Sequence, residues 1–565
     1  MKIITVYKKK GCKKMLKFYR GIFLAVVVSK IFESLIKGRI EPELKKVNLL
    51  QGGSRSERGP PDNLFLVRGC VDHYVATKQP LYMSAYDYEQ AFDSLWVEKC
   101  ILALKNLGVS KEMLQLIYNL NKKAEVIVKT PYGLTTSFET SPIVKQGTVL
   151  GSILCSSSTG EYCGVNKGIL VGDMLLSSLL YVDDVLDLTM SLADRQEAHL
   201  QALLFSKESN LWLSGTKCFC MGINNNGELL DPMVIDSEKV VIPVHEIIYL
   251  GDVFNDMGNN DGLIKDRVKR AIKATISIAS LIQEANLGIY EVSVWLLLYR
   301  SLFLSTVLFN SETWSRLSET DINQLHVVQM KFLKKVFGLA SSTSSSFLLL
   351  EFGVLPIEAE IHKRQLMYLH KILQRDVSDP VAQMFRNLVN FSEKGEENWW
   401  TGVKPLLRKY GLPEDTEVIK LLSKTTFKTI VNKGIEHFMF QKLKTDCSKL
   451  KKTADLKYTR LGMQEYLQVL YPSQSKLILK SRCRTLDIKT QNTYKFNDEM
   501  CRKCEMCVES LEHINCKQAE EIQLCVSEIE EISDVVSVQL TRIASRIQNF
   551  LEDVEQGHGS MDSEE

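Results

Sequence analysis

The sequence predicts an α+β protein followed by a long helical region, on the evidence of two patterns along its 565 residues. From Leu81 to Gly251, segments of strand character alternate with segments of helical character, and turn residues separate them. Beyond Gly251, strand signals fade and apolar residues such as Ile264, Val268 and Ile272 recur at helical spacing. A chain of this length is expected to form roughly three to five globular units.

Charge is distributed unevenly along the chain, although the net formal charge is only +2. Residues 1–60 contain 15 basic and 4 acidic side chains, and residues 441–490 contain 12 and 4. Residues 517–565 show the reverse, with 3 basic and 12 acidic side chains. Basic stretches of this size favour a polyphosphate partner such as nucleic acid, and the acidic end is expected to stay away from it.

Cysteine content and hydropathy predict an intracellular protein without a membrane segment. The 14 cysteines come with no secretory leader, since the apolar run from Gly21 to Val28 is too short for a signal core. The best candidate for a membrane span, Val292 to Asn310, is interrupted by Arg300. We therefore expect a reducing compartment, nuclear or cytoplasmic, and no membrane partner.

Local signals predict individual elements of the mixed region. Periodic apolar residues predict a helix from Ile22 to Ile36, and Ser110 is a typical N-cap for a helix that ends near Leu120. The other expected elements are a loop at Gln51 to Pro61, a strand at Leu81 to Tyr88, a helix at Val97 to Leu107, and a hairpin of Glu125 to Lys129 with Leu134 to Phe138.

Two adjacent aspartates, Asp183 and Asp184, interrupt the apolar pattern of Leu179 to Leu186 and predict a hairpin with both at its turn. A buried core would not tolerate this pair without partners. Asp87 lies at the end of the strand that begins at Leu81, so the three carboxylates converge if the two strand ends are neighbours. The simpler alternative is a solvated turn.

Clustered carboxylates repel one another, and divalent cations are an economical means of stabilising them. Mg²⁺ prefers oxygen ligands and also accepts substrate phosphates. Two such ions, about 3.5 to 4 Å apart, can activate a primer 3′-hydroxyl, align it with an incoming α-phosphate and neutralise the departing pyrophosphate. The three aspartates therefore indicate nucleotidyl transfer with two Mg²⁺ ions.

Several motifs resemble those of reverse transcriptases from non-LTR (LINE-type) retrotransposons. Tyr181 to Asp184 is similar to the family's active-site signature, and Asp87 to Asp93 resembles its D-x-x-x-A-F-D motif. Val144 to Gly147 resembles the Q-G motif between them, and the order and spacing agree. Further similar segments are Tyr7 to Leu24 in the fingers, Ser214 to Lys217 after the active hairpin, and the primer-grip turn Tyr249 to Gly251.

The resemblance covers roughly residues 1–516 and implies a right-hand polymerase fold with RNA-directed DNA synthesis. The implied partners are an RNA template, a DNA primer or target, and dNTPs. Together with the composition, it divides the chain into fingers (1–80), palm (81–255), helical thumb (256–340), a helical and basic region (341–495), a zinc-knuckle-like module (496–518) and an acidic amphipathic tail (519–565).

The resemblance also implies roles for individual residues. Asp87, Asp183 and Asp184 would be the metal ligands, and Lys217 would approach the leaving pyrophosphate as an acid. Nucleotide contacts are implied for Arg20, Phe92, Gln146, Gly147 and Tyr181, and a primer grip for Tyr249, Leu250 and Gly251. Outside their motifs, Arg20 and Lys217 would be ordinary surface cations.

The chain departs from the family's pattern in two respects. Many relatives place a Ser-Pro pair after the Q-G motif, whereas this chain has Gly151-Ser152, so the loop lacks the fixed φ of proline. No nuclease domain is recognisable on either side of the polymerase motifs. We therefore expect only the polymerase part of such an element.

A cysteine cluster predicts a small zinc module, with reduced cysteines in a helical bend as the alternative. The four expected ligands are Cys501, Cys504, His513 and Cys516. Basic residues nearby, including Lys480 and Arg484, would contact phosphates. In the tail, apolar residues recur every seven positions from Ile522 to Phe550, which favours a helix that packs on its own thumb, with self-association as the alternative.

Two other functions compete with reverse transcription. RNA-directed RNA synthesis is disfavoured by Phe92, which follows Asp87 by five residues and is expected beneath the sugar of the incoming nucleotide. An apolar ring there would clash with a 2′-hydroxyl. The alternative is that Phe92 is only a core anchor of the palm. A decayed element that only binds nucleic acid is disfavoured by the intact aspartates.

Overall fold

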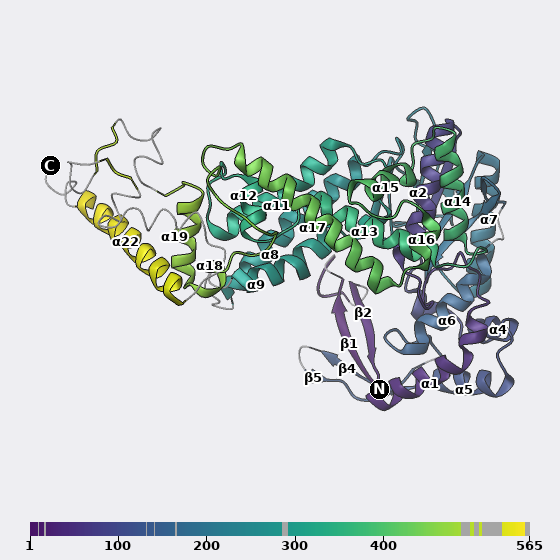
Figure 1. The fold of residues 1–565 in the computed structure, drawn as a ribbon. Helices are drawn as coiled ribbons and strands as arrows, with labels where there is room; N and C mark the ends of the chain where they lie inside the picture. Colours follow the sequence, from purple (N-terminus) through teal and green to yellow (C-terminus); the bar gives the residue numbers. More distant parts are fainter. Residues whose placement is uncertain are drawn as a thin grey trace. The chain divides into compact units, whose positions relative to one another are not determined.

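The computed structural model describes residues 1–8, 11–15, 18–130, 133–140, 142–163, 167–284, 292–486, 498–501, 508–510 and 534–559. The chain forms two compact units (Figure 1). Unit 1 comprises Met1–Leu263, Thr313–Arg316 and Lys371–Gly402, and unit 2 comprises Ile264–Glu312, Leu317–His370 and Val403–Glu565. Unit 1 mixes strands with helices, and the described elements of unit 2 are helices, so the predicted α+β succession is confirmed.

The centre of unit 1 is a six-stranded sheet in the order β12-β13-β11-β3-β10-β9. Its strands are β3 (Leu81–Tyr86), β9 (Ser178–Tyr181), β10 (Asp184–Thr189), β11 (Phe219–Ile223), β12 (Met233–Val234) and β13 (Val240–Pro243). β3 is buried along most of its length and pairs antiparallel with both β10 and β11. The strand predicted at Leu81 and the hairpin predicted around Asp183 are confirmed.

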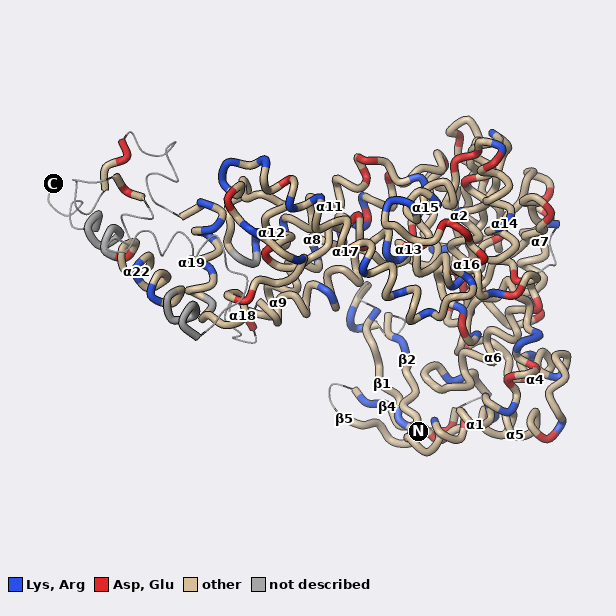
Figure 2. The backbone as a smooth tube through the Cα atoms, in the orientation of Figure 1, with Lys and Arg blue, Asp and Glu red and all other residues tan. Residues whose placement is uncertain are grey.

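A second sheet contains the basic N-terminal hairpin, whose lysines and arginines are marked in Figure 2. Its strands are β1 (Lys2–Tyr7), β2 (Tyr19–Leu24), β4 (Glu125–Thr130), β5 (Gly133–Leu134) and β6 (Phe138–Glu139). β5 and β6 both pair antiparallel with β4, which confirms the predicted hairpin. The helix predicted from Ile22 is wrong at its start, because Ile22 pairs with Ile4 across the sheet and the helix begins only at Val27.

Unit 1 also contains helices and two further hairpins. The helices are α1 (Val27–Leu44), α2 (Pro60–Thr77), α3 (Ala91–Ser94), α4 (Val97–Asn106), α5 (Lys111–Asn121), α6 (Val149–Thr159), α7 (Leu192–Ser209) and α14 (Pro380–Glu393). The hairpins are β7 (Ile169–Val171) with β8 (Met174–Leu176), and β14 (Glu246–Tyr249) with β15 (Asp252–Asn255). The Ser110 hydroxyl accepts a hydrogen bond from the Met113 N–H at 3.4 Å, so the predicted cap of α5 is confirmed.

Helix α2 has no counterpart among the predicted elements. Most of its side chains are buried, so the sequence shows no amphipathic period there. Its buried charges have partners within unit 1: Asp62 lies 2.7 Å from Arg375, and Arg68 lies 2.8 Å from Asp252. Burial on every face and paired charges place α2 in the interior of the unit, beside α14.

From residue 261 onward the chain is helical, as predicted. The elements outside α14 are α8 (Asp261–Glu284), α9 (Val292–Leu298), η3 (Tyr299–Leu304), α10 (Ser305–Val307), η4 (Ser311–Thr313), α11 (Glu319–Phe337), α12 (Ser345–Glu351), α13 (Ile357–Leu373), α15 (Trp399–Lys409), α16 (Thr416–Leu421), α17 (Lys424–Ser448), α18 (Tyr466–Val469), α19 (Pro472–Arg482) and α22 (Asp534–Gly559). Within the described residues, no helix is long and apolar enough to cross a membrane.

The tail helix α22 packs within unit 2. Ile543 and Phe550, two of the residues predicted to form its apolar stripe, are buried together with Leu540 and Ile547. Its partner is α19, which lies beyond the segment expected to be the thumb. Packing on the same chain is therefore observed, but against a different element from the one predicted.

Candidate active site

The sheet register places two of the predicted aspartates opposite each other. Val185 pairs with Tyr86 as the last residue pair of the antiparallel β10–β3 ladder. The next residues beyond that pair are Asp184 on one strand and Asp87 on the other. Because directly opposed residues of an antiparallel pair are neighbours, the two carboxylates share one end of the sheet. The convergence expected from the sequence rests on this register.

Asp183 is carried by the tight turn between β9 and β10. The turn is closed by Tyr181, which pairs with Asp184. Its second residue, Val182, has a φ of +62°. This left-handed conformation is unfavourable for a β-branched residue and costs on the order of 1–3 kcal/mol. The surrounding structure must therefore stabilise the turn that carries both aspartates.

A groove of about 310 Å³ lies at this end of the sheet. Asp87 and Asp184 line it together with Lys217, and Tyr249 and Leu250 of the β14–β15 turn lie along its border. Leu250 and Gly251 have φ values of +46° and +86°, which makes the turn tight. The structure thus brings the predicted primer-grip turn beside the predicted metal ligands.

Lys217 reaches the site through the other neighbour of β3. Phe219 pairs with Ala85 in the β11–β3 ladder, and two residues beyond that pair Lys217 stands opposite Asp87. The Lys217 ammonium forms an ion pair with the Asp87 carboxylate, and both side chains remain partly exposed. Lys217 is therefore at the site as predicted, and its partner in this structure is a carboxylate.

The electrostatics of the aspartates show how strongly they interact. Asp184 lines an open groove. Protein atoms around its carboxylate displace part of the water that would otherwise surround it. This desolvation, followed by the charges of Asp183 and Asp87, raises the pKa of Asp184 to about 7. Burial also raises the pKa of Asp183, and the positive charges of Lys217 and Arg20 oppose that shift. Ionised carboxylates are thus held together here at a cost in stability.

The predicted nucleotide contacts Arg20, Gln146 and Gly147 belong to one connected piece of structure. The Phe23 N–H of β2 donates to the Gln146 carbonyl at 2.9 Å, so the strand that carries Arg20 adjoins the Q-G motif. Gly147 has a φ of +102°, and a Cβ there would lie 2.9 Å from the Phe23 carbonyl oxygen. Glycine is required at this position by both conformation and space.

The loop after the Q-G motif is ordered without the proline that relatives have. Thr148 caps α6 by accepting from the Gly151 N–H at 3.2 Å, and the buried Glu33 carboxylate accepts from the Leu150 N–H at 3.1 Å. A Cβ at Gly151 would lie 2.3 Å from the Lys145 carbonyl oxygen. Hydrogen bonds and close packing therefore hold this loop.

Two predicted nucleotide contacts flank the aspartates. Phe92 is half-buried in the short helix α3, which follows Asp87 after a left-handed residue, Gln90, with a φ of +51°. Tyr181 is half-buried, and burial raises the pKa of its hydroxyl. Both residues remain predicted contacts of the incoming nucleotide.

The donor set fits a divalent cation in its chemistry. Three carboxylates gather at one sheet end, and a divalent cation would relieve the repulsion that raises the pKa of Asp184. Among the residues that the structure describes, no three His, Cys, Asp or Glu side chains already stand as a metal-ligating group. Asp87 forms an ion pair with Lys217 in this structure, so a cation would compete with Lys217 for its carboxylate.

The predicted zinc site falls mostly outside the described residues. Cys504, His513 and Cys516 lie in the segments that the structure does not describe. Cys501 is described and is buried. The zinc module therefore stays a prediction.

Two residues that the sequence interpretation missed form hydrogen bonds with the elements that carry the site. Asn63 of α2 donates to the Leu180 carbonyl at 2.8 Å and to the Tyr249 hydroxyl at 3.1 Å, which links the active hairpin to the β14–β15 turn. Gln51, which the sequence placed only in a loop, contacts Val182. An amide in a glycine-rich loop gives no local signal of such a role, because its partners lie more than 100 residues away.

Comparisons with known proteins find one matching family and two similar proteins from mobile elements. Residues 7–253 match the family described as reverse transcriptase (RNA-dependent DNA polymerase). The chain is 24% identical over 355 residues to the RNA-directed DNA polymerase from mobile element jockey of Drosophila funebris, covering 57% of this chain and 36% of that protein. It is also 24% identical over 222 residues to the transposon TX1 uncharacterized 149 kDa protein of Xenopus laevis, covering 38% and 17%.

The chain thus spans about a third and a sixth of the lengths of these two relatives. Among solved structures, apo telomerase from Candida tropicalis has a TM-score of 0.33 at 13% identity, covering 74% of this chain and 67% of that one. The matched residues contain Arg20, Asp87, the Q-G motif, Asp183, Asp184 and Lys217, and the family fits the predicted right-hand polymerase fold. Residues 7–253 therefore match the reverse transcriptase family, and the chain is similar to an RNA-directed DNA polymerase from a mobile element.

Proposed function

We propose that this chain synthesises DNA on an RNA template by two-metal nucleotidyl transfer to a primer 3′-hydroxyl. The observation that supports this most directly is the convergence of Asp87, Asp184, Lys217 and the Tyr249–Leu250 turn on one groove, with Asp183 on the adjoining turn. These elements come from four separate parts of the sequence. Their assembly at one sheet end is what transfer of a nucleotide to a held primer requires.

The proposed reaction assigns a task to each of these groups. Asp87, Asp183 and Asp184 would hold Mg²⁺, which supplies Lewis-acid activation of the primer hydroxyl and neutralises phosphate charge. Arg20 would bind the triphosphate, with Gln146 and Gly147 beside the nucleotide and template. Lys217, released from Asp87, would donate a proton to the departing pyrophosphate. Tyr249, Leu250 and Gly251 would hold the primer.

The direct test is primer extension by the purified chain on an RNA template with Mg²⁺ and dNTPs. We expect template-dependent DNA products that depend on the added cation. A catalytically decayed remnant is the competing function, and it would bind the primer–template without extending it. Measuring binding and extension on the same preparation separates the two functions.

Sugar selection is expected to depend on Phe92. A ring beneath the incoming sugar would clash with a 2′-hydroxyl and offer it no hydrogen bond, which disfavours ribonucleotides. Phe92→Val is expected to raise ribonucleotide incorporation relative to deoxynucleotide by about 10- to 100-fold, or roughly 1.4 to 2.7 kcal/mol. Single-nucleotide kcat/KM values for dNTP and rNTP measure this ratio. Unchanged selectivity in a folded, active variant would make Phe92 a core anchor only.

The domain assignments stay part of this proposal: fingers 1–80, palm 81–255, thumb 256–340, and beyond them a basic region that contacts nucleic acid. The cysteine cluster would bind Zn²⁺ through Cys501, Cys504, His513 and Cys516. Elemental analysis of the full chain for zinc tests that assignment. A content far below one zinc per chain after purification without chelators would remove it.

A further inference from the structure

Gln51 is fully buried, and two of its four side-chain hydrogen bonds go to Val182, in the turn between β9 and β10. Its Oε1 accepts from the Val182 N–H at 2.9 Å and from the Gly53 N–H at 2.8 Å. Its Nε2 donates to the Val182 carbonyl at 3.1 Å and to the Thr159 hydroxyl at 2.9 Å. An amide has two donors and room for two acceptor contacts, so this side chain is saturated.

The two contacts with Val182 hold both peptide groups of the strained residue. Val182 has the φ of +62° that a β-branched side chain disfavours. Its N–H and its carbonyl are each bound by the same amide, and the Thr159 hydroxyl adds a second donor to the carbonyl at 2.7 Å. The orientation of the Gln51 amide is determined by its partners, because two N–H donors require the oxygen on one side.

The backbone beside Gln51 is joined to the same hairpin. The Gly52 N–H donates to the Leu180 carbonyl at 2.8 Å, and the Leu180 N–H donates to the Leu50 carbonyl at 3.0 Å. A Cβ at Gly53 would lie 2.4 Å from the Val182 nitrogen, so only glycine permits this approach. Leu50 to Gly53 therefore lies directly against β9 and the turn.

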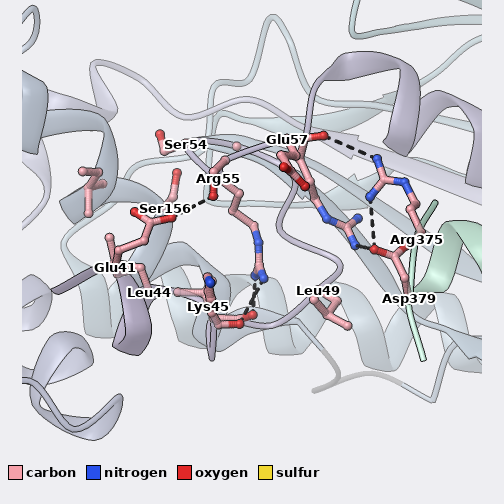
Figure 3. A pocket seen from close by; sticks show the side chains of 16 residues that line it. Glu41, Leu44, Lys45, Leu49, Ser54, Arg55, Glu57, Ser156, Arg375 and Asp379 are labelled. Carbon is pink, nitrogen blue, oxygen red and sulfur yellow. Dashed lines mark hydrogen bonds and ion pairs between the residues drawn. The ribbon is translucent and has the colours of Figure 1, made fainter. Parts of the chain in front are cut away.

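The part of the loop that follows Gly53 is also held in place by hydrogen bonds and ion pairs. Figure 3 shows Arg55 pointing to the carbonyl groups beside Lys45, where its guanidinium donates to the Lys45 carbonyl at 3.1 Å. It also donates to the Asn48 carbonyl at 3.1 Å. Farther along the loop, Arg58 pairs with Asp379, which also lies 3.1 Å from Arg375.

We propose that Gln51 is a positioning residue for catalysis, which holds the Val182 peptides so that Asp183 and Asp184 keep the orientation needed for nucleotidyl transfer. This inference rests on the proposed polymerase function. Gln51 does not line the groove and touches no reacting group. It acts through the turn, because the two residues that follow Val182 are the predicted metal ligands. Small errors in such positions reduce rates strongly.

Gln51→Met tests the inference because it keeps the length and volume of the side chain and removes its polar atoms. The matched control is Asn398→Leu in the same unit, since Asn398 is another buried amide that donates to the Leu388 carbonyl at 2.9 Å and accepts from the Trp400 N–H at 2.9 Å. Both variants lose buried hydrogen bonds, so both are expected to lower the melting temperature.

Only Gln51→Met is expected to reduce kcat, by about 30- to 100-fold, with the KM for primer–template unchanged. The Mg²⁺ concentration for half-maximal activity should rise in the same variant. Binding of Mn²⁺ followed by electron paramagnetic resonance, without nucleotide, should weaken in parallel and does not depend on turnover. Equal kcat values for the wild type, Gln51→Met and Asn398→Leu would overturn the inference.

A double-mutant cycle with Val182→Gly separates a positioning role from general destabilisation. Glycine adopts a φ of +62° freely, so the turn then needs less support from Gln51. We expect Gln51→Met to cost less than about tenfold in kcat in the Val182→Gly background. The same fold-loss in both backgrounds would contradict the inference. An inactive wild type would instead remove the proposed function, which makes the two failures distinguishable.

Discussion

Asp183→Asn is expected to abolish dNTP incorporation, with a fall in kcat of about 1,000-fold or more, or roughly 4 kcal/mol in the barrier. The amide keeps the size of the carboxylate but loses the charge that a divalent cation requires. Binding of a primer–template duplex should stay nearly intact, because Asp183 is a predicted metal ligand and not a phosphate contact. Single-turnover extension and a binding titration on the same preparation measure the two effects.

The same variant is expected to keep or raise the thermal stability of the protein. Burial and the neighbouring Asp87 carboxylate raise the pKa of Asp183, so its ionised form is less favourable in the folded chain than in the unfolded chain. A carboxyl group with a raised folded pKa costs stability at pH values above its unfolded pKa, and a neutral amide removes this cost. Loss of activity together with an undiminished melting temperature marks a functional carboxylate.

Asp187→Asn on β10, the strand that follows Asp183, is the matched control. Asp187 is buried and accepts a hydrogen bond from the Tyr162 hydroxyl at 2.8 Å, which an amide oxygen can also accept. It lies three residues from Asp184 and does not line the groove. We expect activity within a few-fold of the wild type. Activity of Asp183→Asn within about tenfold of the wild type would rule out the metal assignment.

Glu351→Leu is expected to destabilise unit 2 by about 3–5 kcal/mol, because it leaves the buried Arg482 guanidinium without its main counter-charge. Both side chains are completely buried, and Arg482 Nη2 and Nε lie 2.8 and 2.9 Å from the Glu351 carboxylate. The Tyr458 and Tyr466 hydroxyls donate to the same carboxylate at 2.5 and 2.6 Å. One carboxylate thus joins α12 to three later residues of the unit.

Thermal and urea unfolding of the full chain measure this loss. The double variant Glu351→Leu with Arg482→Leu should recover part of it, because no unpaired charge is then buried. Glu414→Leu is the exposed control: Glu414 lies 3.0 Å from Arg408 on the surface, and little change is expected. A Glu351→Leu variant as stable as the Glu414→Leu variant would show that the buried cluster contributes nothing.

The elements that sequence alone predicted correctly are those with local signals. The strand before Asp87 and the hairpin around Asp183 follow from short apolar runs broken by polar residues. Ser110 predicts the start of α5, because a capping side chain binds a backbone N–H only three residues away. The motif order also predicted roles for Asp87, Asp183, Asp184 and Lys217, and residues 7–253 match the reverse transcriptase family that it indicated.

Tertiary structure decided where local signals were ambiguous or absent. The run at Ile22 has apolar residues that suit a helix or a strand, and pairing with Ile4 made it a strand. Helix α2 is buried on every face, so it lacks the polar stripe by which a helix is recognised. In both cases the deciding contacts come from other segments of the chain.

The sequence by itself predicted which groups would carry the chemistry, because residue types and their spacing are local properties. Only the tertiary structure decided that Lys217 pairs with Asp87 and that Gln51 holds Val182, since these partners are 130 and 131 residues apart in the chain. The order of the strands in the sheet brings Lys217 to Asp87. The glycines beside Gln51 let its loop lie close to Val182. Neither leaves a periodic trace in the sequence, because packing between distant segments selects them.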